Sequence, residues 1–143
     1  MDDMSRYIDL IKRAQQGECI LIDGATGTEV ERRGVPQLDN AWNGGGALSH
    51  PEIVKQIHKD YINSGAEIII SNTFATTKHA LRDANQEHKF EALNGRGVEL
   101  AVEARAELDN KSVLVAGGIS YWTWTGNKPS QKELTLSVTK QAQ

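Results

Sequence analysis

Three polar, glycine-containing segments hold the residues whose types and spacing could support chemistry. They are residues 23–28 (DGATGT), 72–74 (NTF) and 117–122 (GGISYW), and each directly follows a short apolar run. Backbone amides exposed at glycine turns attract anions, so the first and third segments could cradle a phosphate. Neither Gly-Lys-Ser/Thr nor Gly-x-Gly-x-x-Gly occurs in the chain, and glycines that only make tight turns explain the pattern equally well.

Histidine and cysteine, the usual ligands of zinc, are few and dispersed. The four histidines are His50, His58, His79 and His88, whose separations match no compact metal-ligand motif. We therefore expect solvated or capping histidines. Cys19 is the only cysteine, which excludes an internal disulfide or a multi-cysteine zinc site, and its place at the start of an apolar run predicts a small core residue.

Tryptophans occupy two of the expected loops. Trp42 precedes the triplet Gly44-Gly45-Gly46, and Trp122 and Trp124 follow the third apolar run. Large aromatic side chains on such loops either line a ligand pocket or pack as a lid, and the sequence leaves both roles open.

Hydrophobic periodicity predicts the elements that must position these loops. Continuous apolar runs predict buried strands, and apolar residues near every third or fourth position predict helices. The expected strands cover residues 19–22, 66–71 and 112–116, and the expected helices cover residues 5–16, 51–64 and 133–140, with 76–109 broadly helical. Ser5 and Ser49 are the expected helix caps, and the glycines of Asn94-Gly95-Arg96-Gly97 predict a break near Gly95.

Strand and helix alternate three times, which predicts parallel pairing with right-handed crossovers and hence an α/β fold. The arrangement could be a segment of a (β/α)8 barrel or an open doubly wound sheet. The chain has 143 residues, whereas a closed barrel needs roughly 250. In both folds ligands bind at the carboxyl ends of the strands, so the three polar segments should share one face.

Composition restricts location and partners. Apolar residues make up 38% of the chain and charged residues 24%, as in globular proteins. The longest purely apolar run has the sequence III at residues 68–70, and residues 1–6 lack the apolar region of a secretory signal, so we expect a cytoplasmic protein that does not bind membranes. Because the net charge is −3 and the basic residues form no stripe, nucleic-acid binding is not expected.

Five motifs resemble, in order and spacing, the homocysteine-binding domain of homocysteine S-methyltransferases, including the betaine-dependent enzymes and the homocysteine module of cobalamin-dependent methionine synthase. The motifs are residues 20–28 (ILIDGATGT), 33–34 (RG), 50–52 (HPE), 64–69 (SGAEII) and 71–74 (SNTF). The likeness runs from about residue 19 to 120. It implies that residues 1–143 form the N-terminal part of such a domain, a partial (β/α)8 TIM barrel with about the first three βα units preceded by an N-terminal helix.

The resemblance also implies which residues contact the substrate. Asp23 and Gly24 match the family's substrate turn, whose carboxylate and backbone amides hold the amino-acid part of homocysteine. An amino acid needs an acceptor for its ammonium and donors for its carboxylate, so an Asp beside exposed amides suits it. Thr73 and Phe74 match the strand-end pair near the substrate. Trp42 resembles the aromatic residue of the loop that contacts the methyl donor in betaine-using members, although the glycine triplet after it departs from those enzymes.

The family's chemistry uses zinc to bind homocysteine as a thiolate, which attacks the activated methyl group of a small donor to form methionine. Three cysteines from later strands of the family's barrel bind that zinc, and none of them occurs in this chain. The resemblance therefore implies a methyltransferase whose catalytic and zinc-binding residues lie outside this portion, and we expect no metal on this chain alone.

Two other functions and one partner follow from the same residues. A noncatalytic small-molecule binding or assembly module could retain the substrate turn without the metal half, and an open α/β nucleotide-binding domain would bind phosphate at Gly24 or Gly117. Three parallel strands that do not close into a barrel leave two unpaired edges, so we also expect the chain to associate with itself through exposed sheet edges.

Overall fold

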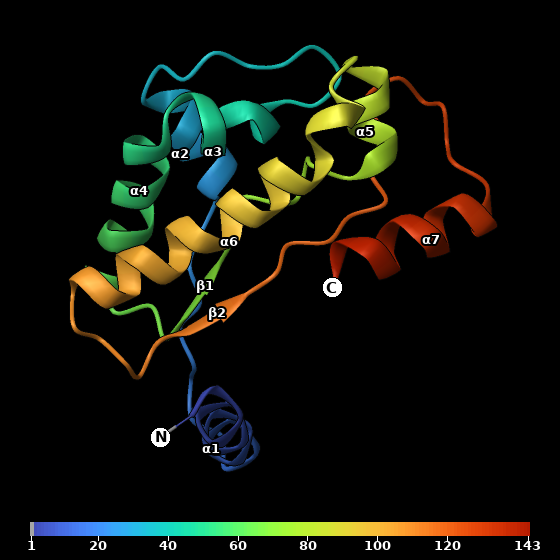
Figure 1. The fold of residues 1–143 in the computed structure, drawn as a ribbon. Coiled ribbons are helices and arrows are strands. Elements are labelled where there is room, and N and C mark those ends of the chain that lie inside the picture. The colour runs from blue at the N-terminus through green and yellow to red at the C-terminus, as the bar shows by residue number, and fades with distance from the viewer. Residues whose placement is uncertain (1) are drawn as a thin grey trace.

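The computed structural model describes residues 2–143, in which helices alternate with short strands (Figure 1). The elements are α1 (Asp3–Gln15), α2 (Thr26–Arg32), α3 (Gly46–Ser49), α4 (Pro51–Asn63), β1 (Ile68–Ile70), α5 (Lys78–Asp83), α6 (Phe90–Glu107), β2 (Leu114–Ala116) and α7 (Gln131–Gln141), with 3-10 turns at Asn43–Gly45 and Glu87–Lys89. Within residues 2–143, none of these helices has the length and apolar character needed to cross a membrane.

The sheet is small and parallel. β1 pairs with β2 so that Ile69 lies opposite Val115. On the other edge of β1, Ile22 forms an isolated parallel bridge with Ile68, and the Asp23 amide donates to the Ile68 carbonyl at 2.9 Å. The predicted parallel strands at 66–71 and 112–116 are therefore confirmed in a shortened form, whereas the strand predicted at 19–22 is reduced to one bridge.

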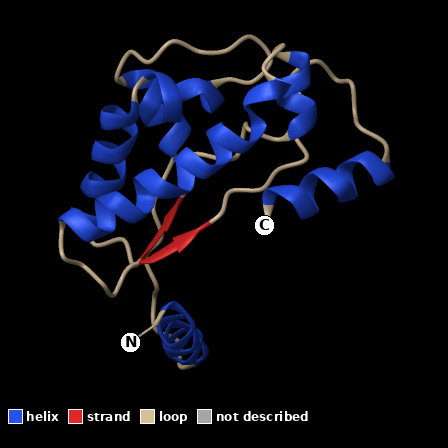
Figure 2. Cartoon of the chain, viewed as in Figure 1, coloured by secondary structure: helices blue, strands red, loops and turns tan. Residues whose placement is uncertain are grey.

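The two faces of the sheet differ in how well they are covered. Helices α2, α3, α4 and α6 gather on one side of the strands (Figure 2), and Ile69, which packs in a cluster with α4 and α6 residues, is fully buried. Its neighbours Ile68 and Ile70 on the opposite face are only partly buried, and Ile22 is 59% exposed. The prediction that residues 19–22 form a buried strand with Cys19 in the core is wrong, because Cys19 is exposed and the described residues put no second layer over this part of the sheet.

Helix α1 stands apart from the helical layer, beyond the amino ends of the strands (Figure 1). Its cap is Asp2, whose Oδ1 accepts from the Ser5 amide at 2.7 Å, so the prediction of Ser5 as the cap is wrong. A carboxylate at this place satisfies a free amide and also meets the positive end of the helix dipole. Arg13 ties α1 to the sheet through an ion pair of 2.7 Å with Glu67.

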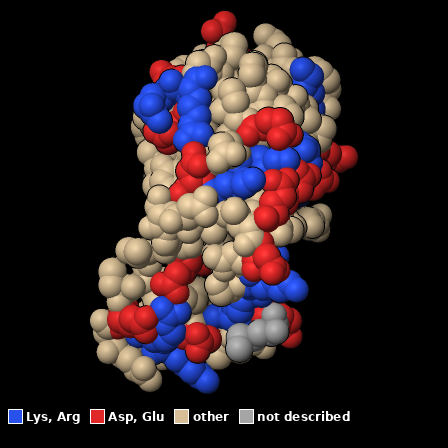
Figure 3. Space-filling model, turned by 90° about the vertical axis from the view of Figure 1, so that its left-hand side faces the viewer, with Lys and Arg blue, Asp and Glu red and all other residues tan. Residues whose placement is uncertain are grey.

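Helices α4 and α6 pack across each other over β1 and β2. Ile57 of α4 and Leu100 of α6 are fully buried in one cluster. On the outside, Lys55 and Lys59 of α4 pair with Glu107 of α6 at 2.9 and 3.0 Å. Acidic and basic side chains are interleaved on the face of the molecule that Figure 3 shows. Apolar packing thus holds the two helices together, and exposed ion pairs of this kind add about 0–1 kcal/mol each.

The start of α4 differs from the prediction. Its first residue is Pro51, and His50, not Ser49, occupies the cap position, although the His50 side chain makes no hydrogen bond that caps the helix. Ser49 ends the preceding helix α3 and its hydroxyl donates to the Gly45 carbonyl at 3.1 Å. The sequence did not predict the short helix α3, and because Ser49 is the last residue of α3 it does not cap α4.

The predicted break near Gly95 is also wrong. α6 runs without interruption through Gly95 and Gly97, and the chain breaks earlier, at Asn85, which adopts a left-handed φ of 56°. Each glycine costs a helix about 1 kcal/mol, which the burial of Leu93 and Leu100 more than offsets.

Helix α7 confirms the helix predicted at 133–140 and extends it at both ends. Ser130 and Glu133 form a capping box, in which Glu133 Oε2 accepts from the Ser130 amide at 2.8 Å. Within residues 2–143, no α7 residue belongs to any of the three hydrophobic clusters. Its attachment is polar: Gln141 Nε2 donates to the Thr73 carbonyl at 2.9 Å and Ser137 Oγ accepts from the Lys78 amide at 3.3 Å.

Candidate functional site

The three polar segments meet at the carboxyl ends of the parallel strands. Asp23 Oδ2 accepts from the Ile70 amide at 2.7 Å, which joins the first segment to the end of β1. Thr73 Oγ1 donates to the Gly118 carbonyl at 2.8 Å and accepts from the Gly118 amide at 3.0 Å, which joins the second segment to the third. The expectation that these segments share one face therefore agrees with the structure.

Asp23 has the features of a ligand-binding carboxylate. Its side chain is nearly inaccessible, with 6% of the residue exposed. Oδ2 is bound to the Ile70 amide, but Oδ1 is buried and has no hydrogen-bond partner in the described residues. Burial raises the pKa of Asp23, opposed by the Ile70 amide and by the nearby Thr26 hydroxyl. A buried carboxylate oxygen without a partner would be stabilised most by a hydrogen bond from a cationic donor.

The glycines of the turn permit close approach of neighbouring groups. A Cβ added at Gly24 would lie 3.1 Å from Tyr61 Oη, and one at Gly27 would lie 1.9 Å from Asn43 Nδ2 and 2.8 Å from the Trp42 ring. Both positions exclude a larger residue without movement of these neighbours. Tyr61 and the Trp42 loop therefore enclose the turn from two sides.

Trp42 lies beside the glycine-containing turn after Asp23. It is half-buried, its φ is 43°, and its Nε1 donates to Glu31 Oε2 of α2 at 3.1 Å. The next residue, Asn43, is buried, with its carbonyl 3.3 Å from Asn72 Nδ2 and its own Nδ2 unpartnered in the described residues. Sequence reasoning missed Asn43, because an asparagine in a glycine-rich loop gives no signal of burial.

Thr73 and Phe74 have different environments. The Thr73 hydroxyl is fully used: besides its two bonds to Gly118 it lies 2.9 Å from Ser71 Oγ. The Phe74 ring is exposed at the strand ends. In this arrangement Thr73 ties β1 to β2, whereas Phe74 offers an aromatic surface.

The two tryptophans of the third loop also have different roles. Trp122 is exposed, next to the exposed Tyr121, at the same end of the sheet as Phe74. Trp124 is half-buried and packs against the cluster that contains Leu81 and Phe90. Trp124 therefore fills the core, and only Trp122 offers its ring to a ligand.

Two of the four histidines contradict the expectation of solvated or capping side chains. His58 is 0% exposed, and neither ring nitrogen has a partner in the described residues. Burial lowers the pKa of His58 to about 4. His79 is also buried, whereas His50 does occupy a cap position and His88 is exposed. Helical spacing places His58 one turn after the buried Val54, so its ring faces the core.

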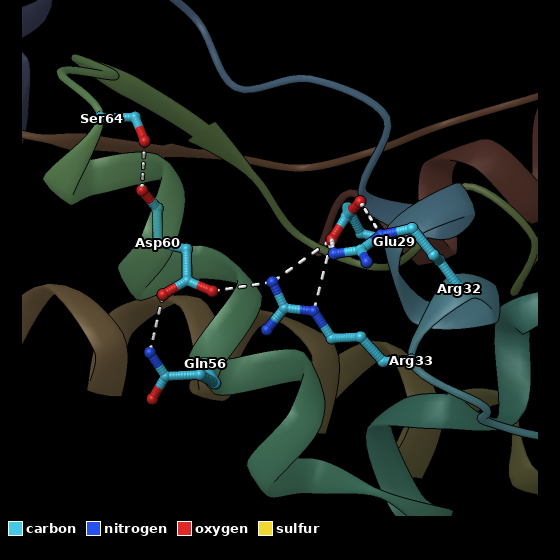
Figure 4. Close-up of polar contacts among 6 residues, drawn as sticks. All are labelled: Glu29, Arg32, Arg33, Gln56, Asp60 and Ser64. Carbon is cyan, nitrogen blue, oxygen red and sulfur yellow. Dashed lines mark hydrogen bonds and ion pairs between the residues drawn. The ribbon is translucent and has the colours of Figure 1, made fainter.

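A polar network fixes α2, the helix that begins right after Asp23 and Gly24 (Figure 4). Arg33, just after α2, pairs with Asp60 of α4 at 2.7 Å and with Glu29 of α2 at 3.3 Å. Glu29 also pairs with Arg32 at 2.7 Å, and the bonds from Arg32 and Arg33 lower the pKa of Glu29 to about 2. The Arg33-Gly34 motif thus anchors α2 on α4 and keeps the turn in place.

The described residues do not fit the zinc that the resemblance implies. Within residues 2–143, no three His, Cys, Asp or Glu side chains gather closely enough to hold a metal ion. Cys19 is exposed at the start of the segment before Asp23.

Comparison with known proteins identifies the family. The family model described as Homocysteine S-methyltransferase matches residues 20–143. The chain belongs to the homocysteine S-methyltransferase family. Its relatives include homocysteine S-methyltransferase 1 of Arabidopsis thaliana, 34% identical over 110 residues, which are 76% of this chain and 33% of the relative. Selenocysteine methyltransferase of Astragalus bisulcatus is 37% identical over 92 residues, 64% of this chain and 27% of that protein.

A solved structure of the same family has a similar fold. The metallated form of the homocysteine methyltransferase MmuM from Escherichia coli matches with a TM-score of 0.64 and 30% identity, over 86% of this chain and 43% of that one. The chain spans about a third of the length of the curated relatives it matches. These matches favour an enzyme family over both the noncatalytic module and the open nucleotide-binding sheet.

Proposed function

We propose that this member of the homocysteine S-methyltransferase family forms the first three units of a (β/α)8 barrel that transfers a methyl group from a small donor to the homocysteine thiol, forming methionine. Three parallel segments whose polar loops meet at one face support the barrel, since ligands bind at that face. The similarity to the Escherichia coli enzyme supports the same arrangement.

The observation that carries the proposal is the state of Asp23. One carboxylate oxygen is fixed by the Ile70 amide, and the other is buried without a partner. An α-amino acid brings an ammonium group with three donors, which would satisfy that oxygen and return a raised carboxyl pKa toward its usual range. In this proposal Asp23 holds the ammonium of homocysteine and the backbone at Gly24 faces its carboxylate.

The remaining candidate residues orient the reacting groups. Phe74 presents an exposed ring after β1, and the half-buried Trp42 ring lies against Gly27; in this proposal the side chain of homocysteine and a cationic methyl donor would lie near these rings. Aromatic faces attract quaternary ammonium or sulfonium groups. Thr73 positions Phe74 by tying its strand end to Gly118. The role that we assign to these residues is to bind and orient the substrate.

Substitution of Asp23 tests the proposal. Asp23→Asn keeps an oxygen for the Ile70 amide but removes the charge, so it should weaken L-homocysteine binding by about 2–4 kcal/mol, the scale of a buried charge-assisted contact. The matched control is Asp39→Asn, which removes an exposed carboxylate outside the turn. Binding would be followed by calorimetry under reducing conditions. Equal affinities of Asp23→Asn and the unmodified chain would show that the turn is only structural.

A further inference from the structure

A cleft of about 570 Å³ separates α5 from α7, away from the substrate turn. Its walls are the facing sides of the two helices, and Glu87, Pro129 and Gln143 complete the lining. None of the candidate homocysteine contacts, Asp23, Gly24, Thr73 and Phe74, lines it. The cleft is therefore a separate feature that the proposed function leaves unused.

His79 gives the cleft a buried acceptor. The residue is 3% exposed, lines the cleft, and has its Nε2 2.7 Å from the Trp122 carbonyl. A carbonyl only accepts, so Nε2 carries the proton and Nδ1 of the neutral ring is an acceptor. Nδ1 is buried without a partner in the described residues. Such orphaned groups are rare in folded proteins, and a donor from a bound molecule would satisfy this one.

Two charges of opposite sign also line the cleft without ion-pair partners in the described residues. Lys78 makes no ion pair; its Nζ lies 5.6 Å from the centre of the Phe90 ring. Glu87, in the turn after α5, makes none either. Their charges are thus available to a ligand.

The other charged groups of the cleft are partly or wholly engaged. Arg82 pairs only at 3.7 Å, with Asp83 and with Glu133, while the other oxygen of Glu133 is held by the Ser130 cap. Lys140 is paired with Glu91 at 2.6 Å. Arg82 therefore adds a loosely held cation next to Lys78, on the same side of α5.

We infer that the cleft between α5 and α7 binds a small zwitterion of the α-amino-acid class, at a site separate from the substrate turn. The ligand's carboxylate pairs with Lys78 and Arg82, and its ammonium donates to His79 Nδ1 and to Glu87. The exposed Leu136 of α7 covers an aliphatic side chain. A simple anion would leave His79 and Glu87 unsatisfied, and a simple amine would leave Lys78 unsatisfied, so the set of groups matches a molecule that carries both charges.

Such a ligand would also complete the packing of α7. Polar contacts attach this helix, among them the bond from the Lys78 amide to Ser137 Oγ across one end of the cleft, and within residues 2–143 none of its residues belongs to the three hydrophobic clusters. A bound zwitterion touching Lys78 on one wall and Leu136 on the other would add contact between the two helices.

Titration of the 143-residue chain followed by amide NMR tests this inference, with L-norleucine as the probe. Hexanoate is the same molecule without the ammonium, and pentylamine is the same molecule without the carboxylate. We expect norleucine to shift the amides of Lys78, Arg82 and Ser137 saturably, and each half-probe to bind at least tenfold more weakly. Hexanoate binding as tightly as norleucine would overturn the inference in favour of an anion site, and no saturable shift at these amides would overturn it outright.

Variants on the surface of the cleft supply the second measurement. Lys78→Gln and Glu87→Gln remove a half-buried and an exposed charge that make no ion pair in the described residues, so the fold should persist. Each variant should weaken the binding of norleucine at least tenfold. Lys132→Gln is the matched control, because Lys132 is an exposed α7 lysine outside the cleft. If Lys132→Gln weakened norleucine binding equally, the attraction would come from the overall charge of the surface, and a specific site in the cleft would be refuted. Asp23→Asn should leave these shifts unchanged, which separates this test from that of the proposed function.

Discussion

Gly97 of α6 should be intolerant of the smallest side chain, although alanine is the better helix former. A Cβ at this position would lie 2.8 Å from Thr73 Cγ2, which is closer than such atoms approach in proteins. Thr73 cannot rotate its methyl away, because its hydroxyl is bound to the amide and carbonyl of Gly118. Gly95, two residues earlier in the same helix, has nothing within 4 Å of an added Cβ and is the matched control.

The two substitutions should therefore change stability in different ways. Each Gly→Ala change stabilises the helix by about 1 kcal/mol through intrinsic propensity. At Gly95 this gain stands alone. At Gly97 the added methyl also overpacks the strand end, which costs about 1–3 kcal/mol, so Gly97→Ala should be less stable than Gly95→Ala by about that amount.

Urea unfolding followed by circular dichroism measures both variants. Thr73→Ser removes Cγ2 but keeps the hydroxyl, so combining it with Gly97→Ala should recover most of the difference in a double-mutant cycle. Because the overlap pushes on the strand end, Gly97→Ala should also shift the amide resonance of Phe74. If Gly97→Ala proves as stable as Gly95→Ala, or if Thr73→Ser brings no recovery, the close approach of α6 to the strand end is not what requires glycine.

Three further predictions concern pH, metal and association. Burial lowers the folded-state pKa of His58 from 6.5 to about 4, so the unfolded chain takes up the proton first as the pH falls. The free energy of unfolding should therefore fall by about 2 kcal/mol between pH 7 and pH 5. The slope of urea-measured stability against pH should be smaller in His58→Leu, and an unchanged slope would contradict a buried, neutral His58. Elemental analysis of the dialysed 143-residue chain should find no stoichiometric zinc, because one exposed cysteine and dispersed histidines provide no ligand set, and about one zinc per chain would disprove this. Sedimentation should show self-association with binding of a hydrophobic dye, because Leu21 and Ile22 are half exposed or more beside an open sheet edge, whereas a monomer with a sharp two-state transition and no dye binding would refute it.

The sequence by itself determined the order of elements and the family. Continuous apolar runs and helical spacing are local properties, so β1, β2, α4 and α7 could be located to within a few residues. The polar segments after these runs were expected to share one face because parallel strands impose that on any such chain, and the bonds between Asp23, Ile70, Thr73 and Gly118 agree. The order and spacing of five motifs identified the homocysteine S-methyltransferase family, which the family match shows.

Burial and hydrogen-bond partners were decided only by the tertiary structure. The apolar run before Asp23 was predicted to be a buried strand, but burial depends on a second layer that no local pattern encodes, and Ile22 is exposed. His58 was expected to be solvated or to cap a helix because the histidine spacing matches no compact metal-ligand motif, yet its place on α4 turns its ring into the core.

The roles of Thr73 and Gly97 likewise became visible only in space. A threonine at a strand end could bind substrate or tie two strands, and its bonds to Gly118, forty-five residues away, show the tie. Gly97 reads as a helix breaker in sequence, but α6 runs through it, and its missing side chain leaves room for Thr73. Such contacts join residues far apart in the chain, so only the packing of the elements could determine them.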